Sequence, residues 1–181
     1  MEPASLSRRG ATNIGWTKGI QGMTEFRFDA ADIDDTERLG KALAAELPAG
    51  TVVALLGTLG AGKTRLVQAV AAALNVDREQ VVSPTFVLLQ QYAGKRPIYH
   101  LDAYRLHDDD EFLQLGPEEF FDGGGLTFIE WADKVERCLP AEHLTIEIEV
   151  TGATSRVFTI RSIGPELEAA VRNVQQHLTK G

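Results

Sequence analysis

The segment Gly57–Thr64 carries the clearest chemical signal in the sequence. It reads Gly-Thr-Leu-Gly-Ala-Gly-Lys-Thr and matches the phosphate-loop pattern G-x-x-x-x-G-K-[ST] at every fixed position. Glycines in this pattern let successive backbone N–H groups face phosphate oxygens, and the helix that follows adds the positive end of its dipole. We therefore predict that a nucleoside triphosphate is held by the loop residues Gly57, Leu59, Gly60, Ala61 and Gly62.

Two side chains at the end of this segment are predicted to act on the ligand. Lys63 should reach the β- and γ-phosphates, and the Thr64 hydroxyl should bind Mg²⁺. The alternative is a glycine-rich turn with an exposed lysine. We disfavour it because the motif follows the apolar run 51–56 and opens a helix, which is the context that a phosphate loop requires.

A phosphate loop also needs a carboxylate at the end of a neighbouring strand, and the sequence offers two. The apolar run 98–101 ends in Asp102, and the run 126–129 ends in Glu130. Both acids should lie at the C-terminal edge of the sheet, where open α/β sheets bind ligands. Spacing alone does not assign their roles, and either acid could instead cap a loop.

The identity of the base is predicted from a missing motif. A GTPase would carry an N/T-K-x-D sequence, and Asp133-Lys134 lacks that arrangement. The sequence therefore favours ATP.

Composition limits the remaining function classes. The 181 residues are 44% hydrophobic and 24% charged, which is ordinary for a soluble globular protein. The net charge of −8 argues against a protein that wraps nucleic acid by itself, because that requires a basic face. The single cysteine cannot form an internal disulfide, and no apolar run approaches the length of a membrane span. We expect a cytoplasmic protein that does not bind membranes.

The chain is predicted to consist of a tail and one domain. Residues 1–22 are rich in Gly, Ser, Thr and Arg without an apolar period, which indicates a disordered tail, and residues 23–181 form a single P-loop domain. Strands are expected near residues 24–28, 51–56, 86–92, 97–101, 126–130, 144–150 and 156–163. Helices are expected after a capping box of Asp34 and Glu37, over 63–74, over 108–121 with a break at Gly116-Pro117, and from Pro165 onward.

This alternation predicts the fold class. Strands interleaved with helices indicate an α/β protein with a three-layer P-loop NTPase-like fold. Its central sheet should be mostly parallel, with an antiparallel portion at the hairpin of residues 144–163.

Four segments taken together resemble one family. The phosphate loop is followed by Ser83–Phe86, by His100–Arg105 in the form H-x-D-x-Y-R, and by Ile129–Trp131. In this order and spacing they resemble the TsaE (YjeE) family of bacterial ATPases, which is needed to make threonylcarbamoyladenosine beside the anticodon of tRNA. The resemblance covers about residues 26–160, and few other P-loop families carry both of the last two motifs.

The resemblance implies an Mg²⁺-dependent ATPase that is weak alone. It implies that the partner is the TsaD–TsaB heterodimer, that ATP hydrolysis resets this complex between turnovers, and that tRNA is reached only through the complex. Lys63 would hold phosphate, Thr64 and Glu130 would hold Mg²⁺, and Asp102 would orient water or organise the metal near the γ-phosphate. Lys63, Asp102 and Glu130 are thus the predicted catalytic residues.

The resemblance also implies further nucleotide contacts. Residues 83–85 would form a switch-like loop in which Thr85 senses the γ-phosphate. Thr36 would lie near adenine and Arg156 would contact the nucleotide. The family often has a small hydroxyl residue at the position of Arg65, but this departure removes no phosphate contact, so Arg65 stays among the predicted nucleotide-binding residues. Thr58 likewise replaces an acid that is common in the family.

Four further features have competing interpretations. His100 at a strand end could make a structural hydrogen bond or act in function, and both readings stay open. Trp131 is expected beside the nucleotide or the partner. The acidic run 108–111 is interpreted as a solvated helix start, and Cys138 receives no role.

Two other functions remain as alternatives. A small-molecule kinase would use the same loop, but the sequence shows no arginine-rich lid. A nucleotide-gated binding module would bind ATP and a partner without appreciable hydrolysis.

Overall fold

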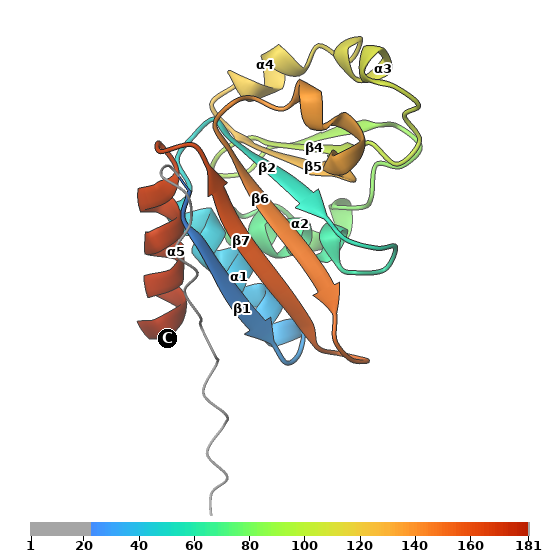
Figure 1. The fold of residues 1–181 in the computed structure, drawn as a ribbon. Coiled ribbons are helices and arrows are strands. Elements are labelled where there is room, and N and C mark those ends of the chain that lie inside the picture. The colour runs from blue at the N-terminus through green and yellow to red at the C-terminus, as the bar shows by residue number, and fades with distance from the viewer. Residues whose placement is uncertain (1–22, 181) are drawn as a thin grey trace, which may run out of the picture.

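The computed structural model describes residues 23–180, so the prediction of a tail over residues 1–22 lies outside the described residues. Within that range the chain forms one seven-stranded mixed sheet between two layers of helices (Figure 1). The strands are β1 (Glu25–Ala30), β2 (Thr51–Leu56), β3 (Leu89–Tyr92), β4 (Ile98–Asp102), β5 (Leu126–Glu130), β6 (His143–Val150) and β7 (Arg156–Ile163). The helices are α1 (Ile33–Glu46), α2 (Lys63–Ala73), α3 (Asp109–Leu113), α4 (Pro117–Phe121) and α5 (Glu168–Lys180), with 3₁₀ segments η1 (Arg78–Gln80) and η2 (Ala132–Cys138).

The strand order confirms the predicted fold class. The order is β1-β7-β6-β2-β5-β4-β3, and the central strands β6, β2, β5 and β4 run parallel to one another. Antiparallel pairs complete both sides: β7 pairs with β6 and β1 with β7 on one side, and β3 pairs with β4 on the other. The predicted hairpin is the β6–β7 pair. The sheet is therefore mixed, with a parallel centre.

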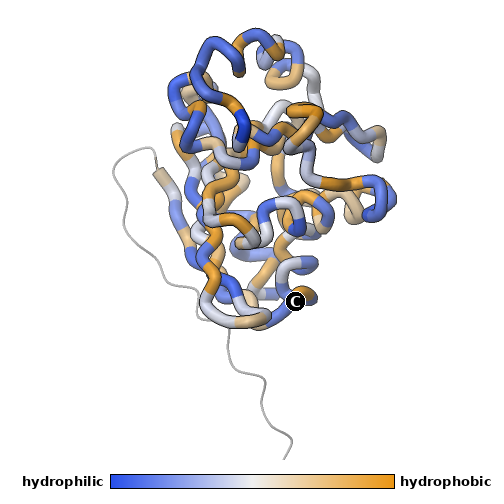
Figure 2. Tube along the Cα trace, turned by 90° about the vertical axis from the view of Figure 1, so that its right-hand side faces the viewer, coloured by the Kyte–Doolittle hydropathy of each residue, from blue (hydrophilic) through white to orange (hydrophobic). Residues whose placement is uncertain are grey.

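Alternate residues of β2 explain why this strand consists only of β-branched and apolar residues. Val53 and Leu55 join the core under α1, α2 and α5, whereas Val52 and Ala54 join a second core under α3 and η2. A strand covered on both faces has no solvent-facing position, so every residue from Thr51 to Ala54 is buried. Figure 2 shows apolar and hydrophilic stretches alternating along the trace, as expected where each outer element covers the sheet with one side only.

The predicted capping box at the start of α1 is wrong by two residues. The N-cap is Asp32, whose carboxylate accepts a hydrogen bond from the Asp35 N–H at 3.1 Å. The Asp35 carboxylate in turn accepts from the Ala31 N–H at 2.9 Å. The pair satisfies two backbone donors reciprocally, as Asp34 and Glu37 were expected to do, because aspartate at the third helical position also reaches back to the chain before the cap.

Two other element starts also differ from the prediction. The strand expected from Phe86 begins at Leu89, because the backbone before it folds into a turn. Leu88 has a φ of 65°, and its N–H donates to the Pro84 carbonyl at 2.7 Å instead of entering the sheet. Helix α5 begins three residues after Pro165, the residue expected to open it.

The C-terminal ends of the parallel strands place the predicted site residues at one edge of the sheet. Strand β2 runs directly into the loop 57–62, while β4 and β5 end in Asp102 and Glu130. These two acids are paired in register, and Glu130 is also opposite Leu55 of β2. The topology therefore brings the loop and both acids together, as predicted.

Candidate nucleotide site

The phosphate loop is built around glycines that no other residue could replace without strain. Gly57 has a φ of 144°, and a Cβ there would lie 2.7 Å from the backbone oxygen of Ile148 on β6. Gly62, the N-cap of α2, has a φ of 112°. These positions need glycine because the first approaches another backbone closely and both adopt a conformation that L side chains rarely adopt. The strand–loop–helix context predicted for the motif is confirmed.

Lys63 is folded back on its own loop. Its ammonium donates to the carbonyl of Gly57 at 2.7 Å and to that of Thr58 at 3.1 Å. The same nitrogen lies 3.8 Å from the centre of the Trp131 ring, a cation–π contact. Burial lowers the pKa of Lys63, and the negative charges of Glu130 and Asp102 oppose that shift. The buried Lys63 side chain therefore packs against Trp131, near the negative charges of the two acids.

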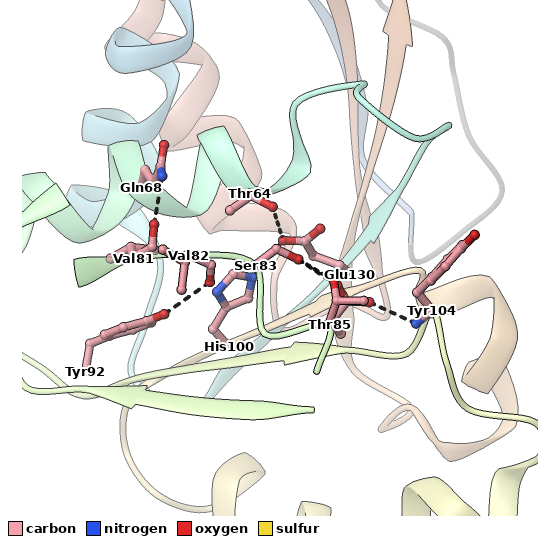
Figure 3. A network of polar contacts seen from close by, with 11 residues as sticks. Thr64, Gln68, Val81, Val82, Ser83, Thr85, Tyr92, His100, Tyr104 and Glu130 are labelled. Carbon is pink, nitrogen blue, oxygen red and sulfur yellow. Dashed lines mark hydrogen bonds and ion pairs between the residues drawn. The ribbon is translucent and has the colours of Figure 1, made fainter. Parts of the chain in front are cut away.

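The Glu130 carboxylate joins α2 to the sheet. Its Oε1 accepts a hydrogen bond from the Thr64 hydroxyl at 2.6 Å and lies 2.8 Å from His100 Nε2. Glu130 and His100 are both buried. Figure 3 shows Thr64 and His100 approaching the carboxylate from different sides. The predicted pair Thr64 and Glu130 is thus brought into direct contact.

Asp102 is hydrogen-bonded to the switch-like loop. Its Oδ2 accepts hydrogen bonds from the hydroxyls of Ser83 at 2.7 Å and Thr85 at 2.6 Å. Its Oδ1 accepts from the Tyr104 N–H at 2.9 Å. The base of the loop is tied down by Gln68, which donates to the Val81 carbonyl at 2.7 Å (Figure 3). The loop that carries Thr85 is therefore held at Val81 by Gln68, and at Ser83 and Thr85 by Asp102.

The phosphate loop separates two cavities. The first, which we call the carboxylate cavity, has a volume of about 400 Å³ and is lined by Leu59, Gly60, Gly62, Lys63, Thr64, Arg65, Ser83, Thr85, Asp102, Tyr104, Glu130 and Trp131. The second, the hairpin cavity, has about 410 Å³ and is lined by Asp32, Ile33, Thr36, Gly60, Ala61, Gly62, Arg65, Ala153, Thr154, Arg156 and Phe158. Gly60, Gly62 and Arg65 belong to both, so the two cavities meet over the loop.

Every predicted site residue lies in or beside these cavities. Thr36 is buried on the wall of the hairpin cavity, and Arg65 is an exposed side chain between the two. Arg156 also faces the hairpin cavity, but its guanidinium is engaged with backbone carbonyls. It donates to Ala61 at 2.9 Å, and to Gly152 and Ser155 of the hairpin turn. Whether these side chains contact a nucleotide stays a prediction.

Some of this site could not be found from the sequence. Nothing in the sequence pointed to Ile33, Ala153 and Thr154 as walls of the hairpin cavity, because no motif includes them. The bond from Ser83 to Asp102 was also missed, although the switch-like segment that contains Ser83 was recognised. His100, by contrast, was recognised with its role left open, and its place two residues before Asp102 puts both residues on one face of β4.

The donor set fits Mg²⁺. Thr64 and Glu130 offer a hydroxyl and a carboxylate within hydrogen-bond distance of each other, and oxygen ligands are those that this hard cation prefers. Over residues 23–180 no group of three or more His, Cys, Asp or Glu side chains could hold a metal ion. A magnesium ion here would rely on phosphate oxygens and water for the rest of its shell, which is its usual mode of binding.

A phosphate loop between a central parallel strand and a helix, with two acids at the same sheet edge, defines the P-loop class of α/β proteins. Within that class the sequence profile described as "Threonylcarbamoyl adenosine biosynthesis protein TsaE" matches residues 30–158. The chain belongs to the TsaE family. In the described part of the chain, no helix is long and apolar enough to cross a membrane.

Individual relatives agree with this assignment. The tRNA threonylcarbamoyladenosine biosynthesis protein TsaE of Bacillus subtilis is 35% identical over 156 residues, covering 86% of this chain and 97% of that protein. The protein of the same name from Treponema pallidum is 39% identical over 126 residues, covering 70% of this chain and 93% of the relative. The crystal structure of Bacillus subtilis YdiB is similar with a TM-score of 0.74 and 31% identity, covering 86% of this chain and 97% of that one.

Proposed function

We propose that this protein is an ATPase required for the threonylcarbamoyladenosine modification of tRNA. Its family and its relatives are named for that biosynthesis. The observation that carries the ATPase assignment is the carboxylate cavity, which gathers Lys63, Thr64, Asp102 and Glu130 over one phosphate loop. A cation, a metal-binding hydroxyl and two acids at this place are the groups that phosphoryl transfer requires.

Each group has a definite task in this proposal. Lys63 leaves the carbonyls of its own loop and binds the β- and γ-phosphates. Thr64 and Glu130 hold Mg²⁺, which supplies positive charge to the phosphate oxygens when bound. Asp102 orients the attacking water or organises the metal near the γ-phosphate. ATP spans both cavities, with its base in the hairpin cavity between Thr36 and Arg156.

The switch-like loop couples the nucleotide to the partner. Ser83 and Thr85 are bonded to Asp102, so a change at Asp102 is felt directly by the loop. The γ-phosphate recruits Thr85 and Asp102, and the resulting closed state docks on the TsaD–TsaB heterodimer. Hydrolysis then resets that complex between turnovers. Equal partner affinity with ATP and with ADP would refute this gating step.

The tRNA is reached through the complex. With a net charge of −8 the chain lacks the overall positive charge that nucleic-acid binding uses. The protein therefore contributes ATP hydrolysis, while its partners carry out the transfer on tRNA. The reaction takes place in the cytoplasm.

The test is phosphate release from ATP, with and without the TsaD–TsaB heterodimer, for wild type and Glu130→Ala. We expect strong stimulation by the partner, abolished in Glu130→Ala and retained in the control Glu147→Ala, whose side chain is exposed on strand β6 of the same sheet. An absence of stimulation, with ATP still bound, would refute the proposal. Transfer of phosphate to a metabolite would favour the kinase, and unchanged turnover in Asp102→Ala would favour the binding module.

A further inference from the structure

His100 is a fully buried polar side chain in the interior strand β4. Its Nε2 lies 2.8 Å from Glu130 Oε1, the same oxygen that accepts the Thr64 hydroxyl at 2.6 Å. On the other side its ring meets Tyr92 at 6.4 Å between centroids. The residue thus touches the proposed metal acid directly, while it lies too deep in the sheet to reach a nucleotide itself.

The contact with Glu130 fixes the tautomer of His100. An ionised carboxylate can only accept hydrogen bonds, so Nε2 carries the proton and donates it to Oε1. Nδ1 is then an acceptor, and within residues 23–180 this buried atom has no hydrogen-bond partner. A buried polar atom without a partner costs stability, which an apolar residue of similar size would avoid. Packing therefore does not account for a histidine here, whereas the bond from Nε2 does.

The sheet register explains why His100 reaches Glu130 from the interior of the sheet and not from the cavity. Strands β4 and β5 are parallel neighbours, with His100 opposite Phe128 and Asp102 opposite Glu130. His100 therefore lies one step deeper in the sheet than Glu130, on the face covered by α2. Thr64 reaches the carboxylate from the first turn of α2, as Figure 3 shows. The imidazole holds Glu130 without occupying the side that faces the carboxylate cavity.

We propose that His100 is a positioning residue that presents Glu130 to the magnesium ion. Its Nε2–H holds Oε1 toward Thr64, so that the hydroxyl and carboxylate ligands are already adjacent when the nucleotide arrives. The inference rests on the proposed function, because it requires Mg²⁺ at Thr64 and Glu130. Hydrogen bonds of this kind behind metal ligands typically affect metal affinity by about 10–100-fold.

The experiment measures how Mg²⁺ tightens ADP binding. Calorimetric titrations of ADP are made in EDTA and at increasing Mg²⁺ for wild type, His100→Leu and His100→Gln. In His100→Leu, we expect the Mg²⁺ concentration for half-maximal tightening to rise about tenfold or more, with ADP affinity in EDTA unchanged. His100→Gln, whose amide can still donate to Glu130, should restore a value close to wild type. Tyr92→Phe, which alters a neighbour of His100 that does not contact Glu130, should behave as wild type.

The outcomes separate this inference from the proposed function. If wild-type ADP binding does not respond to Mg²⁺, the proposed metal site itself is wrong. If wild type responds and His100→Leu responds identically, His100 does not position Glu130. A loss of ADP affinity in EDTA that is equal in the Leu and Gln variants would show a structural role and overturn the inference. If His100→Leu does not fold, His100→Asn replaces it, since its amide is too short to reach Glu130 while remaining polar.

Discussion

Arg156 provides a quantitative test of how the phosphate loop is held. Its guanidinium donates to the carbonyls of Ala61, Gly152 and Ser155 at 2.9, 3.1 and 2.8 Å, which ties the loop to the β6–β7 turn. Ala61 is fully buried on the wall of the hairpin cavity, so removing the arginine leaves its carbonyl without its protein partner. The carbonyls of the hairpin turn can be rehydrated. The bond to Ala61 should therefore account for most of the effect of Arg156→Ala.

The expected magnitude follows from that one bond. A hydrogen bond from a charged donor contributes about 1.5–3 kcal/mol, so we expect Arg156→Ala to lower the free energy of unfolding by about 2 kcal/mol. For a chain of this size that corresponds to a Tm lower by about 4–8 °C. A loosened loop should also weaken ADP binding about tenfold, equivalent to about 1.4 kcal/mol.

Urea unfolding and ADP titration measure the two effects. The matched control is Arg161→Ala on the same strand, which removes a partly exposed ion pair with Glu25 and should cost at most about 1 kcal/mol. Equal losses of stability in both variants, with ADP affinity unchanged, would refute this reasoning. Arg156→Lys keeps the positive charge but cannot make the same set of hydrogen bonds to the loop and the turn. If this variant binds ADP as wild type does while its stability stays reduced, Arg156 acts on the nucleotide by its charge.

Three further predictions concern single positions. Gly57→Ala should lower stability by about 2 kcal/mol or more and abolish ADP binding, measured by urea unfolding and calorimetry, because its methyl group would clash with the Ile148 backbone. Arg96→Ala should lower stability by about 2 kcal/mol without changing ADP affinity in the same assays, because its guanidinium bonds the last carbonyls of α1, far from the site. Burial raises the pKa of the Cys138 thiol, so its alkylation by iodoacetamide should be slow at neutral pH and should accelerate at a higher pH than in urea-unfolded protein.

The parts of the fold that follow from local pattern were predictable. Residues 51–56 are β-branched or apolar at every position because both faces of β2 are covered, and the predicted bounds of this strand are those observed. The acids Asp102 and Glu130 could be found because each follows an apolar strand, and parallel strands end at one edge. In these cases a single physical cause, burial in a parallel sheet, determines both the residue type and its position.

The parts that depend on tertiary contacts were not predictable. Val87 and Leu88 have strand-like side chains, yet the turn before β3 is fixed by bonds of their N–H groups to the Pro84 carbonyl and by the latch between Thr85 and Asp102. The hairpin cavity is likewise formed where α1 meets the β6–β7 turn, and no local sequence pattern records that meeting. Spacing along the chain could not say which acid pairs with which hydroxyl.

The hydrogen bonds of the site also bear on why such an ATPase would need a partner. Lys63 is bonded to its own loop, Thr64 to Glu130, and Asp102 to Ser83 and Thr85. Each group that is expected to act on ATP must exchange an existing protein contact for a nucleotide contact, so the net free energy gained on binding is smaller than the new contacts alone would give. A partner that binds only the rearranged loop would add the missing free energy, because a ligand shifts a conformational equilibrium by its difference in affinity for the two states. On the proposed function, weak activity alone and strong activity in a complex would be two consequences of the same set of internal hydrogen bonds.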